Sequence, residues 1–165
     1  MFSIRLLTSN DWYLLRRIRL TALSESPDAF LSSYDRESAY TEQTWRGEFA
    51  RGDWSIATRH DLAIGVLGAT IESAARMHER HLEYLWVSPE YRRFGVASML
   101  LSAVLGRLRD SGVATAMLWV LDGNAPAWQL YERFGFTSTH ERQPLEADPA
   151  RSEERLRLSL RGASR

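Results

Sequence analysis

The chain contains no cysteine and no lysine, and all 21 of its basic residues are arginine. The lack of cysteine excludes disulfide bonds, thiolate metal ligands and a cysteine nucleophile, and it favours a reducing cytoplasmic location. The chain also lacks an excess of charge, because 21 acidic residues balance the arginines and leave a formal net charge of zero. Non-specific binding of nucleic acid or of an anionic membrane requires a positive field, so we expect neither partner.

A long hydrophobic run is also missing. The longest stretch without a charged residue, residues 94–106, is too short to span a bilayer, which takes about 20 apolar residues. Residues 1–7 lack an apolar core segment and a small-residue cleavage site, so no signal peptide is expected. With 165 residues, of which 44% are hydrophobic, the chain is predicted to form one folded domain over residues 1–165.

Hydrophobic periodicity and turn residues divide the chain into alternating strands and helices. The expected strands are residues 2–7, 54–58, 62–71, 82–87, 116–121, 136–141 and 156–160. The expected helices lie within residues 12–23, 41–52, 96–112 and 124–135. This order predicts a mixed α/β domain around a single sheet, with a strand, helix, strand crossover in its middle.

Other signals refine these elements. Residues 24–40 are expected to form a long loop or a broken helix, and residues 142–155 a polar link between the last two strands. Trp45, with a second aromatic residue one turn later, either packs in the core or lines a substrate pocket. Gly65 and Gly68 within an expected strand indicate a bulge or a close approach of the backbone.

The residues that follow the expected strand 82–87 have the composition of an anion site. Arg92 and Arg93 offer cationic donors, and Gly95 lets an anion approach the main chain. The small side chain of Ala97 leaves room beside the main chain. The unpaired N–H groups at a helix start favour a phosphate or a pyrophosphate, although an ordinary strand-to-helix turn can have the same sequence. The glycine patterns of nucleoside triphosphate loops and of dinucleotide folds are absent.

Two segments resemble signatures of the GNAT superfamily of N-acetyltransferases. Residues 85–97 are similar to its acyl-CoA signature, because Arg92, Gly95 and Ala97 occupy the three places of the pattern Arg/Gln-x-x-Gly-x-Gly/Ala. Residues 124–136 resemble its second signature, a helix that starts with Asn and ends in Tyr-x-x-x-Gly-Phe. The order of elements is similar to that of the superfamily from residue 2 to residue 161.

The resemblance implies an enzyme that moves an acetyl group from acetyl-CoA to a primary amine of a small molecule or a peptide, by direct attack in a ternary complex. It also implies a sheet of about seven strands with about four helices, two strands splayed apart at the acyl-CoA site, and a homodimer. The residues that it assigns to acetyl-CoA binding are Leu85, Trp86, Val87, Arg92, Arg93, Phe94, Gly95, Val96, Ala97 and Asn124.

The catalytic residues follow from the same resemblance. Tyr131 occupies the family position of the acid that protonates the CoA thiolate, although a tyrosine on this helix also suits a packing role. Glu83 is the first candidate for the base, because strand alternation places it on the face of residues 85 and 87. Glu79, His81 and ordered water are the alternatives, and Glu83 also fits an exposed carboxylate on a solvated face.

No metal ion is expected, because the four histidines, His60, His78, His81 and His140, show no ligand spacing and have no thiolate partners. The resemblance places residues 24–40 and 142–155 around the amine acceptor. Asn124 caps its helix, contacts the cofactor, or does both. Two other functions fit the sequence: an acyl-CoA-binding sensor or regulatory module without catalysis, and a phosphate-ligand binding protein unrelated to CoA.

Overall fold

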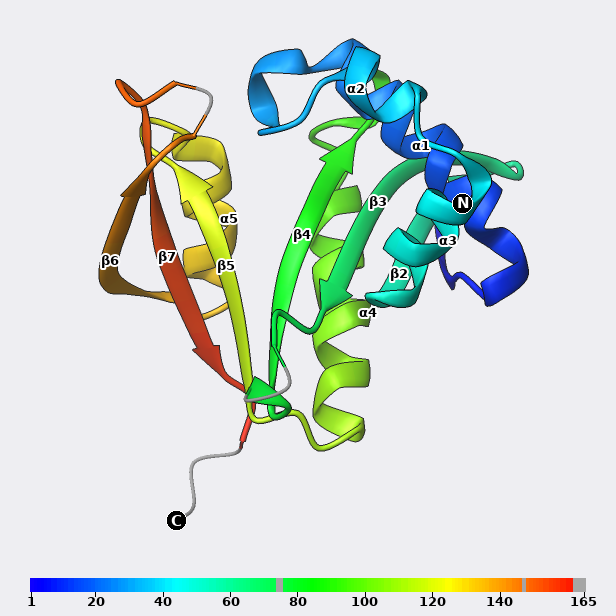
Figure 1. The fold of residues 1–165 in the computed structure, drawn as a ribbon. Helices are drawn as coiled ribbons and strands as arrows, with labels where there is room; N and C mark the ends of the chain where they lie inside the picture. The colour runs from blue at the N-terminus through cyan, green and yellow to red at the C-terminus, as the bar shows by residue number, and fades with distance from the viewer. Residues whose placement is uncertain (74–75, 147, 162–165) are drawn as a thin grey trace. The chain divides into compact units, whose positions relative to one another are not determined.

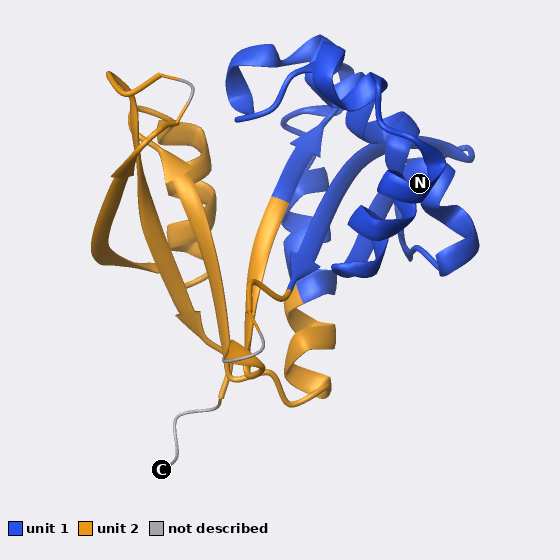
Figure 2. Ribbon diagram, viewed as in Figure 1, with its two compact units in different colours: residues 1–70, 84–104 blue, residues 71–83, 105–165 orange. Residues whose placement is uncertain are grey.

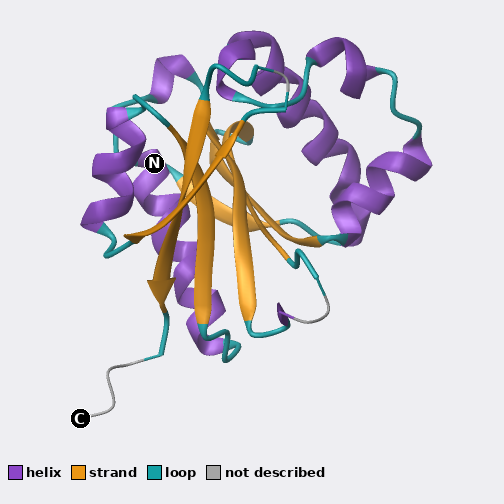
Figure 3. Ribbon diagram, turned by 60° about the vertical axis from the view of Figure 1, so that its left-hand side comes forward, coloured by secondary structure: helices purple, strands orange, loops and turns teal. Residues whose placement is uncertain are grey.

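The structure is a computed structural model that describes residues 1–73, 76–146 and 148–161, and within these residues it has seven strands in one sheet and five α-helices (Figures 1 and 3). The strands are β1 (Ser3–Leu6), β2 (Gly52–Arg59), β3 (Leu62–Thr70), β4 (Glu79–Val87), β5 (Thr115–Leu121), β6 (Thr137–Pro144) and β7 (Ser152–Ser159). The helices are α1 (Trp12–Glu25), α2 (Tyr34–Ser38), α3 (Glu42–Ala50), α4 (Val96–Asp110) and α5 (Ala125–Arg133).

The sheet is mixed, and its strand order is β1-β2-β3-β4-β5-β7-β6. Antiparallel pairing joins β1 to β2, β2 to β3, β5 to β7, and β6 to β7. Strands β4 and β5 are parallel, with a shared register over residues 79–81 and 115–117. A parallel pair needs a crossover connection, which α4 provides. The predicted mixed α/β class with about seven strands is therefore confirmed.

The chain forms two compact units, coloured separately in Figure 2. Unit 1 contains residues 1–70 and 84–104, and unit 2 contains residues 71–83 and 105–165. Each unit combines two separate stretches of the sequence, and the unit boundaries fall inside β4 and inside α4. Neither unit is therefore a continuous segment of the chain.

The core of unit 1 lies between α1 and its strands. Leu15, Ile18 and Ala22 recur at helical spacing on α1, and they pack with buried strand residues that include Trp54 and Trp86. Their side chains are 0–5% exposed. These residues form the buried face of α1, and the helix expected within residues 12–23 is confirmed.

The hairpin of β2 and β3 shows why glycine occurs within a strand. A Cβ atom on Gly68 would lie 2.4 Å from the indole ring of Trp54, and a Cβ on Gly65 would lie 3.0 Å from the carbonyl oxygen of Trp86. The register also shifts between Ala57 and Thr58, opposite Gly65. Both predicted features, a bulge and a close approach, are present.

A second hydrophobic cluster in unit 1 contains Trp45. Trp45 of α3 is 1% exposed and packs with Leu20 and Leu23 of α1. Thr41 caps α3, because its hydroxyl oxygen accepts a hydrogen bond from the backbone N–H of Thr44 at 3.2 Å. Trp45 is therefore a core residue and does not line a substrate pocket.

Strands β4, β6 and β7 extend three or four residues beyond the bounds read from the sequence. Strand β4 begins at Glu79 and not at residue 82, because residues 79–81 pair with β5 although they are polar. Half of the expected link 142–155 is strand, since residues 142–144 belong to β6 and residues 152–155 to β7, and residues 142–144 pair with residues 152–154. Cross-strand contacts, such as the ion pair of Arg142 with Glu154 at 3.0 Å, account for the polar sequence. The segment 24–40 is a broken helix that contains α2. Helix α2 brings the number of α-helices among the described residues to five, one more than the four expected.

Candidate active site

The turn after β4 presents backbone N–H groups at the start of α4. The first hydrogen bond of this helix runs from the N–H of Met99 to the carbonyl oxygen of Gly95 at 3.0 Å, so the preceding amides have no acceptor within the helix. Gly95 has a φ of +81°, and a Cβ atom placed on it would meet no atom within 4 Å. This exposed backbone, together with the helix dipole, is suited to a phosphate group.

The two arginines of the turn have different environments. The Nε of Arg92 donates to the carbonyl oxygen of Val87 at 3.0 Å, and its Nη2 donates to the hydroxyl oxygen of Ser26 at 3.2 Å. Arg92 therefore connects the turn to the end of β4 and to the C-terminal cap of α1. Arg93 is exposed and has a φ of +69°, so it presents its guanidinium group to solvent beside the helix start.

The remaining residues predicted for the cofactor turn lie at its surface or beneath it. Phe94 is 66% exposed, whereas Val96 is 2% exposed and anchors α4 in the core. Ala97 is half-buried. Of these three side chains, only Phe94 and Ala97 reach the surface of the turn.

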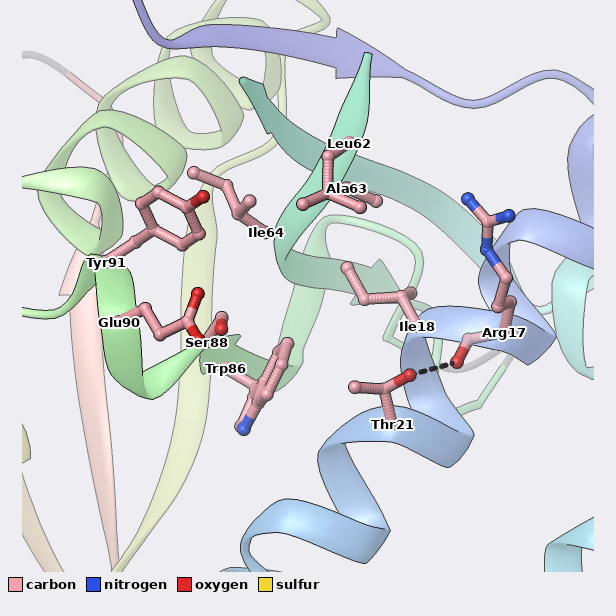
Figure 4. Close-up of a pocket in the computed structure, with 10 residues that line it drawn as sticks. All are labelled: Arg17, Ile18, Thr21, Leu62, Ala63, Ile64, Trp86, Ser88, Glu90 and Tyr91. Atoms are coloured by element: carbon pink, nitrogen blue, oxygen red, sulfur yellow. Dashed lines mark hydrogen bonds between the residues drawn. The ribbon is translucent and has the colours of Figure 1, made fainter. Parts of the chain in front are cut away.

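A pocket of about 380 Å³ borders this turn on the side of α1 (Figure 4). Its walls are mostly apolar, and the carboxylate of Glu90 and the guanidinium of Arg17 lie on opposite sides of it (Figure 4). Its lining residues come from α1, β3, Trp86 and the turn: Arg17, Ile18, Thr21, Leu62, Ala63, Ile64, Trp86, Ser88, Glu90 and Tyr91. The pocket lies entirely within unit 1.

Strand β4 has an unusual backbone conformation where it carries the candidate site residues. Tyr84 has a φ of +64°, which is rare for a bulky residue. Regular strand alternation does not continue through a left-handed residue, so alternation does not place Glu83 on the same face as Leu85. Glu83 and Leu85 are half-buried, and Trp86 and Val87 are 5% and 8% exposed.

The two rival base candidates belong to an ionic network in unit 2. The Nδ1 of His81 lies 3.4 Å from a carboxylate oxygen of Glu72, and Glu79 lies 3.7 Å from Arg76. Glu72 also binds Arg155 of β7 at 2.9 Å. Glu72 and Arg155 were not predicted as part of the site, because no local sequence pattern reveals a contact between residues 83 positions apart.

Tyr131 and Asn124 lie on α5 and at its start, within unit 2. Tyr131 is 8% exposed, and its ring meets that of Phe136 edge to face at a centroid distance of 5.7 Å. Burial raises the pKa of the Tyr131 phenol well above its usual value, so the hydroxyl keeps its proton. The Oδ1 of Asn124 accepts a hydrogen bond from the N–H of Ala127 at 3.3 Å, which confirms the predicted cap.

The described residues show neither a membrane-spanning helix nor a metal-binding cluster. No described helix is both long enough and apolar enough to cross a membrane. No group of three or more His, Asp or Glu side chains among residues 1–73, 76–146 and 148–161 is arranged to hold a metal ion.

The sequence was compared with curated proteins. It is 28% identical to a mycothiol acetyltransferase of Brachybacterium faecium over 137 residues, which cover 74% of this chain and 41% of that protein. It is 36% identical to the ribosomal protein bS18-alanine N-acetyltransferase of Escherichia coli K12 over 72 residues, which cover 44% of this chain and 49% of that protein. The chain therefore spans less than half the length of these relatives.

Solved structures and family models extend the comparison. The structure of the yncA acetyltransferase from Salmonella typhimurium, with its cofactor acetyl-CoA, matches with a TM-score of 0.80 and 17% identity. The match covers 100% of this chain and 97% of that one, and it shows a shared fold. The model of the acetyltransferase (GNAT) family matches residues 17–136, which include both signature segments. The chain belongs to the GNAT family of acetyltransferases.

Proposed function

We propose that this protein is an N-acetyltransferase that transfers the acetyl group of acetyl-CoA directly to a primary amine of a small molecule or a peptide. The observation that carries the proposal is the turn 92–97, where a left-handed glycine exposes the amides at the start of α4 in a chain of the GNAT family. The relative from Salmonella typhimurium has acetyl-CoA as its cofactor, which supports the same choice here.

The cofactor-binding residues of the proposal have distinct roles. The amides of Val96 and Ala97 bind the pyrophosphate, Gly95 keeps their surroundings open, and Arg93 adds a positive charge. Arg92 shapes the turn through its bonds to Val87 and Ser26, and so contributes to binding indirectly. Phe94 offers an exposed ring beside the turn. Asn124 is proposed to contact the cofactor in addition to capping α5.

Acetyl-CoA supplies a thioester, which a free amine can attack with release of the CoA thiol. The backbone of Leu85, Trp86 and Val87 is proposed to donate a hydrogen bond to the thioester oxygen, where negative charge develops. Tyr131 is proposed to donate its proton to the departing sulfur. Burial raises the pKa of Tyr131 and keeps its phenol protonated, so the residue has a proton to donate at every physiological pH.

An amine attacks only as the free base, and an alkylammonium has a pKa near 10, so the site needs a group that accepts a proton. Glu83 remains our first candidate, because one of its carboxylate oxygens is buried at the centre of β4. Glu79 and His81 are the alternatives, and both lie close to charged partners. Substitution of each by Gln, followed by a pH profile of kcat/KM, identifies the base.

The amine acceptor is proposed only as a class. Two relatives are named for mycothiol and for an alanine of a ribosomal protein. We assign neither of these to this chain as its acceptor. A cytoplasmic location and a homodimer also stay predictions. Light scattering of the purified protein measures its mass in solution and tests the homodimer.

The test is release of the free CoA thiol from acetyl-CoA in the presence of pooled amines. We expect thiol release with at least one pool, and a decrease in kcat of about 100-fold or more in Tyr131→Phe, the range for loss of a general acid. Tyr13→Phe is the matched control, because Tyr13 of α1 is 53% exposed. Tight acetyl-CoA binding without thiol release from any pool would favour the acyl-CoA sensor instead.

A further inference from the structure

A buried ion pair in unit 1 joins α1 to α2. Arg19 of α1 and Glu37 of α2 are both 3% exposed, and three hydrogen bonds of 2.9–3.3 Å connect the guanidinium and the carboxylate. Replacing such a pair with apolar residues often leaves stability unchanged, whereas removing one partner leaves a buried charge. A contribution to stability therefore does not explain why this pair is present.

The guanidinium of Arg19 also lies between two aromatic rings. It is 3.6 Å from the ring centroid of Tyr84 on β4 and 4.5 Å from that of Phe30, which precedes α2. A planar guanidinium can stack its faces on rings while its edge binds a carboxylate, whereas the ammonium of lysine has no plane to stack. The ring of Tyr84 is further packed against Trp54 at a centroid distance of 5.0 Å. Arg19 and Trp54 together fix the Tyr84 ring.

Tyr84 is the residue of β4 with the left-handed backbone, at φ +64°. Such a conformation costs free energy in a bulky residue and persists only where the surroundings impose it. The peptide that follows Tyr84 leads directly into Leu85, Trp86 and Val87. The orientation of those amides depends on the backbone at Tyr84, and Arg19 holds the ring of that residue.

We propose that Arg19, oriented by Glu37, is a positioning residue that holds Tyr84 in its left-handed conformation and thereby aligns the backbone of β4 for acetyl transfer. The proposal rests on the proposed function, because alignment matters only if those amides act on the thioester. Misplacement of such donors lowers the rate of the chemical step more than it lowers cofactor affinity. Arg19 therefore acts on kcat through Tyr84.

Arg19→Lys tests this role, because lysine keeps the charge beside Glu37 but cannot stack between two rings. We expect kcat to fall about tenfold, with KM for acetyl-CoA changed less than twofold. Arg36→Lys is the control, since Arg36 is the exposed arginine next to Glu37 on α2, and it should leave both constants unchanged. If Arg19→Lys does not fold, the double variant Arg19→Met with Glu37→Leu replaces it, because no unpaired charge is then buried.

The effect of Arg19→Lys must depend on the residue at position 84. In a Tyr84→Gly background, where the left-handed conformation carries no penalty, we expect Arg19→Lys to change kcat less than twofold. In a Tyr84→Phe background, which keeps the ring, the tenfold loss should return. Equal losses in the glycine and phenylalanine backgrounds would overturn the proposal, because Arg19 would then act without Tyr84.

The same variants are also compared by urea unfolding, which does not depend on activity. Arg19→Lys should raise the ratio of unfolded to folded protein about tenfold with Tyr84 and less than threefold with Tyr84→Gly. If the unsubstituted protein releases no CoA thiol, the proposed function fails, while the unfolding ratios still decide whether Arg19 holds Tyr84. If Arg19→Lys changes the unfolding ratio equally with Tyr84 and with Tyr84→Gly, the contact between Arg19 and Tyr84 does not hold the left-handed conformation, and the proposal is refuted.

Discussion

Gly95 and Gly112 adopt nearly the same backbone conformation, and their comparison isolates the binding role of Gly95. Their φ angles are +81° and +78°, and a Cβ atom would meet no neighbour within 4 Å at either position. Alanine at each position should therefore lower stability by a similar amount, about 1 kcal/mol for a left-handed residue. Only Gly95→Ala should also weaken acetyl-CoA binding, by tenfold or more, because its methyl group lies beside the proposed phosphate amides.

Isothermal titration with acetyl-CoA and urea unfolding measure the two effects separately. Gly112→Ala is the control for backbone strain, because it follows the other end of α4 and is not proposed to contact the cofactor. Similar losses of affinity in both variants would show that the binding change comes from general destabilisation.

Tyr131 gives a prediction about stability at high pH. Burial raises the pKa of its phenol in the folded protein, whereas the unfolded chain has a tyrosine pKa of about 10. Below pH 10 both forms are protonated, and above it only the unfolded form loses its proton, which favours unfolding. The free energy of unfolding should therefore fall above pH 10 by up to about 1.4 kcal/mol per pH unit, relative to Tyr131→Phe.

Urea unfolding of the two proteins between pH 9 and about pH 11 provides the measurement. The comparison cancels the other titrating groups, since the two chains differ by one hydroxyl. A difference between the two proteins that stays constant across this pH range would contradict a buried neutral phenol.

At the scale of elements, the caps of α3 and α5 separate a structural role from a binding role. The side chains of Thr41 and Asn124 both accept a hydrogen bond from a backbone N–H in the first turn. Thr41→Ala and Asn124→Ala should each cost about 1 kcal/mol of stability. Of the two substitutions, only Asn124→Ala should raise KM for acetyl-CoA, because Asn124 is proposed to contact the cofactor and Thr41 is not.

Asn124→Asp provides a further control, since aspartate caps a helix as well as asparagine does. Its stability should match that of the unsubstituted protein. If KM for acetyl-CoA is unchanged in Asn124→Ala, then Asn124 is a cap alone and its cofactor contact is excluded.

Elements with strong local signals were predictable from the sequence. Helix α3 has a capping threonine and an apolar face, and the turn 92–97 has a glycine where the backbone is left-handed. Strands β6 and β7 were predicted too short, because their polar residues are paired across the strands and their pattern resembles a loop. The burial of Arg19, Glu37 and Arg155 depends on partners distant in sequence, which no local pattern shows.

The candidate site, like the fold, was predictable where the signal is local and not where it depends on distant contacts. The helix start after β4 and the capping role of Asn124 follow from residue types at fixed spacing. The position of Glu83 did not follow, because the alternation argument assumes a regular strand and Tyr84 interrupts it. A tyrosine has no preference for a left-handed backbone, so its conformation is imposed by tertiary contacts such as the one with Arg19.

On the scale of the whole molecule, helix α4 contributes residues to both compact units. Residues up to 104 of this helix belong to unit 1 and residues from 105 to unit 2. Its side chains Leu101 and Leu105, which are 0% and 1% exposed, lie one turn apart on either side of that boundary. Because helix formation is cooperative, loss of either end weakens the other. The chain should therefore unfold in a single transition.

The six tryptophans allow this prediction to be tested unit by unit. Trp54 reports on unit 1 and Trp119 on unit 2, and 5-fluorotryptophan labelling gives each a separate NMR signal during urea unfolding. Leu101→Ala and Leu105→Ala should each lower stability by about 2–5 kcal/mol and shift both signals to the same lower midpoint. If Leu105→Ala moves the midpoint of Trp119 and leaves that of Trp54 in place, the units unfold independently and α4 does not couple them.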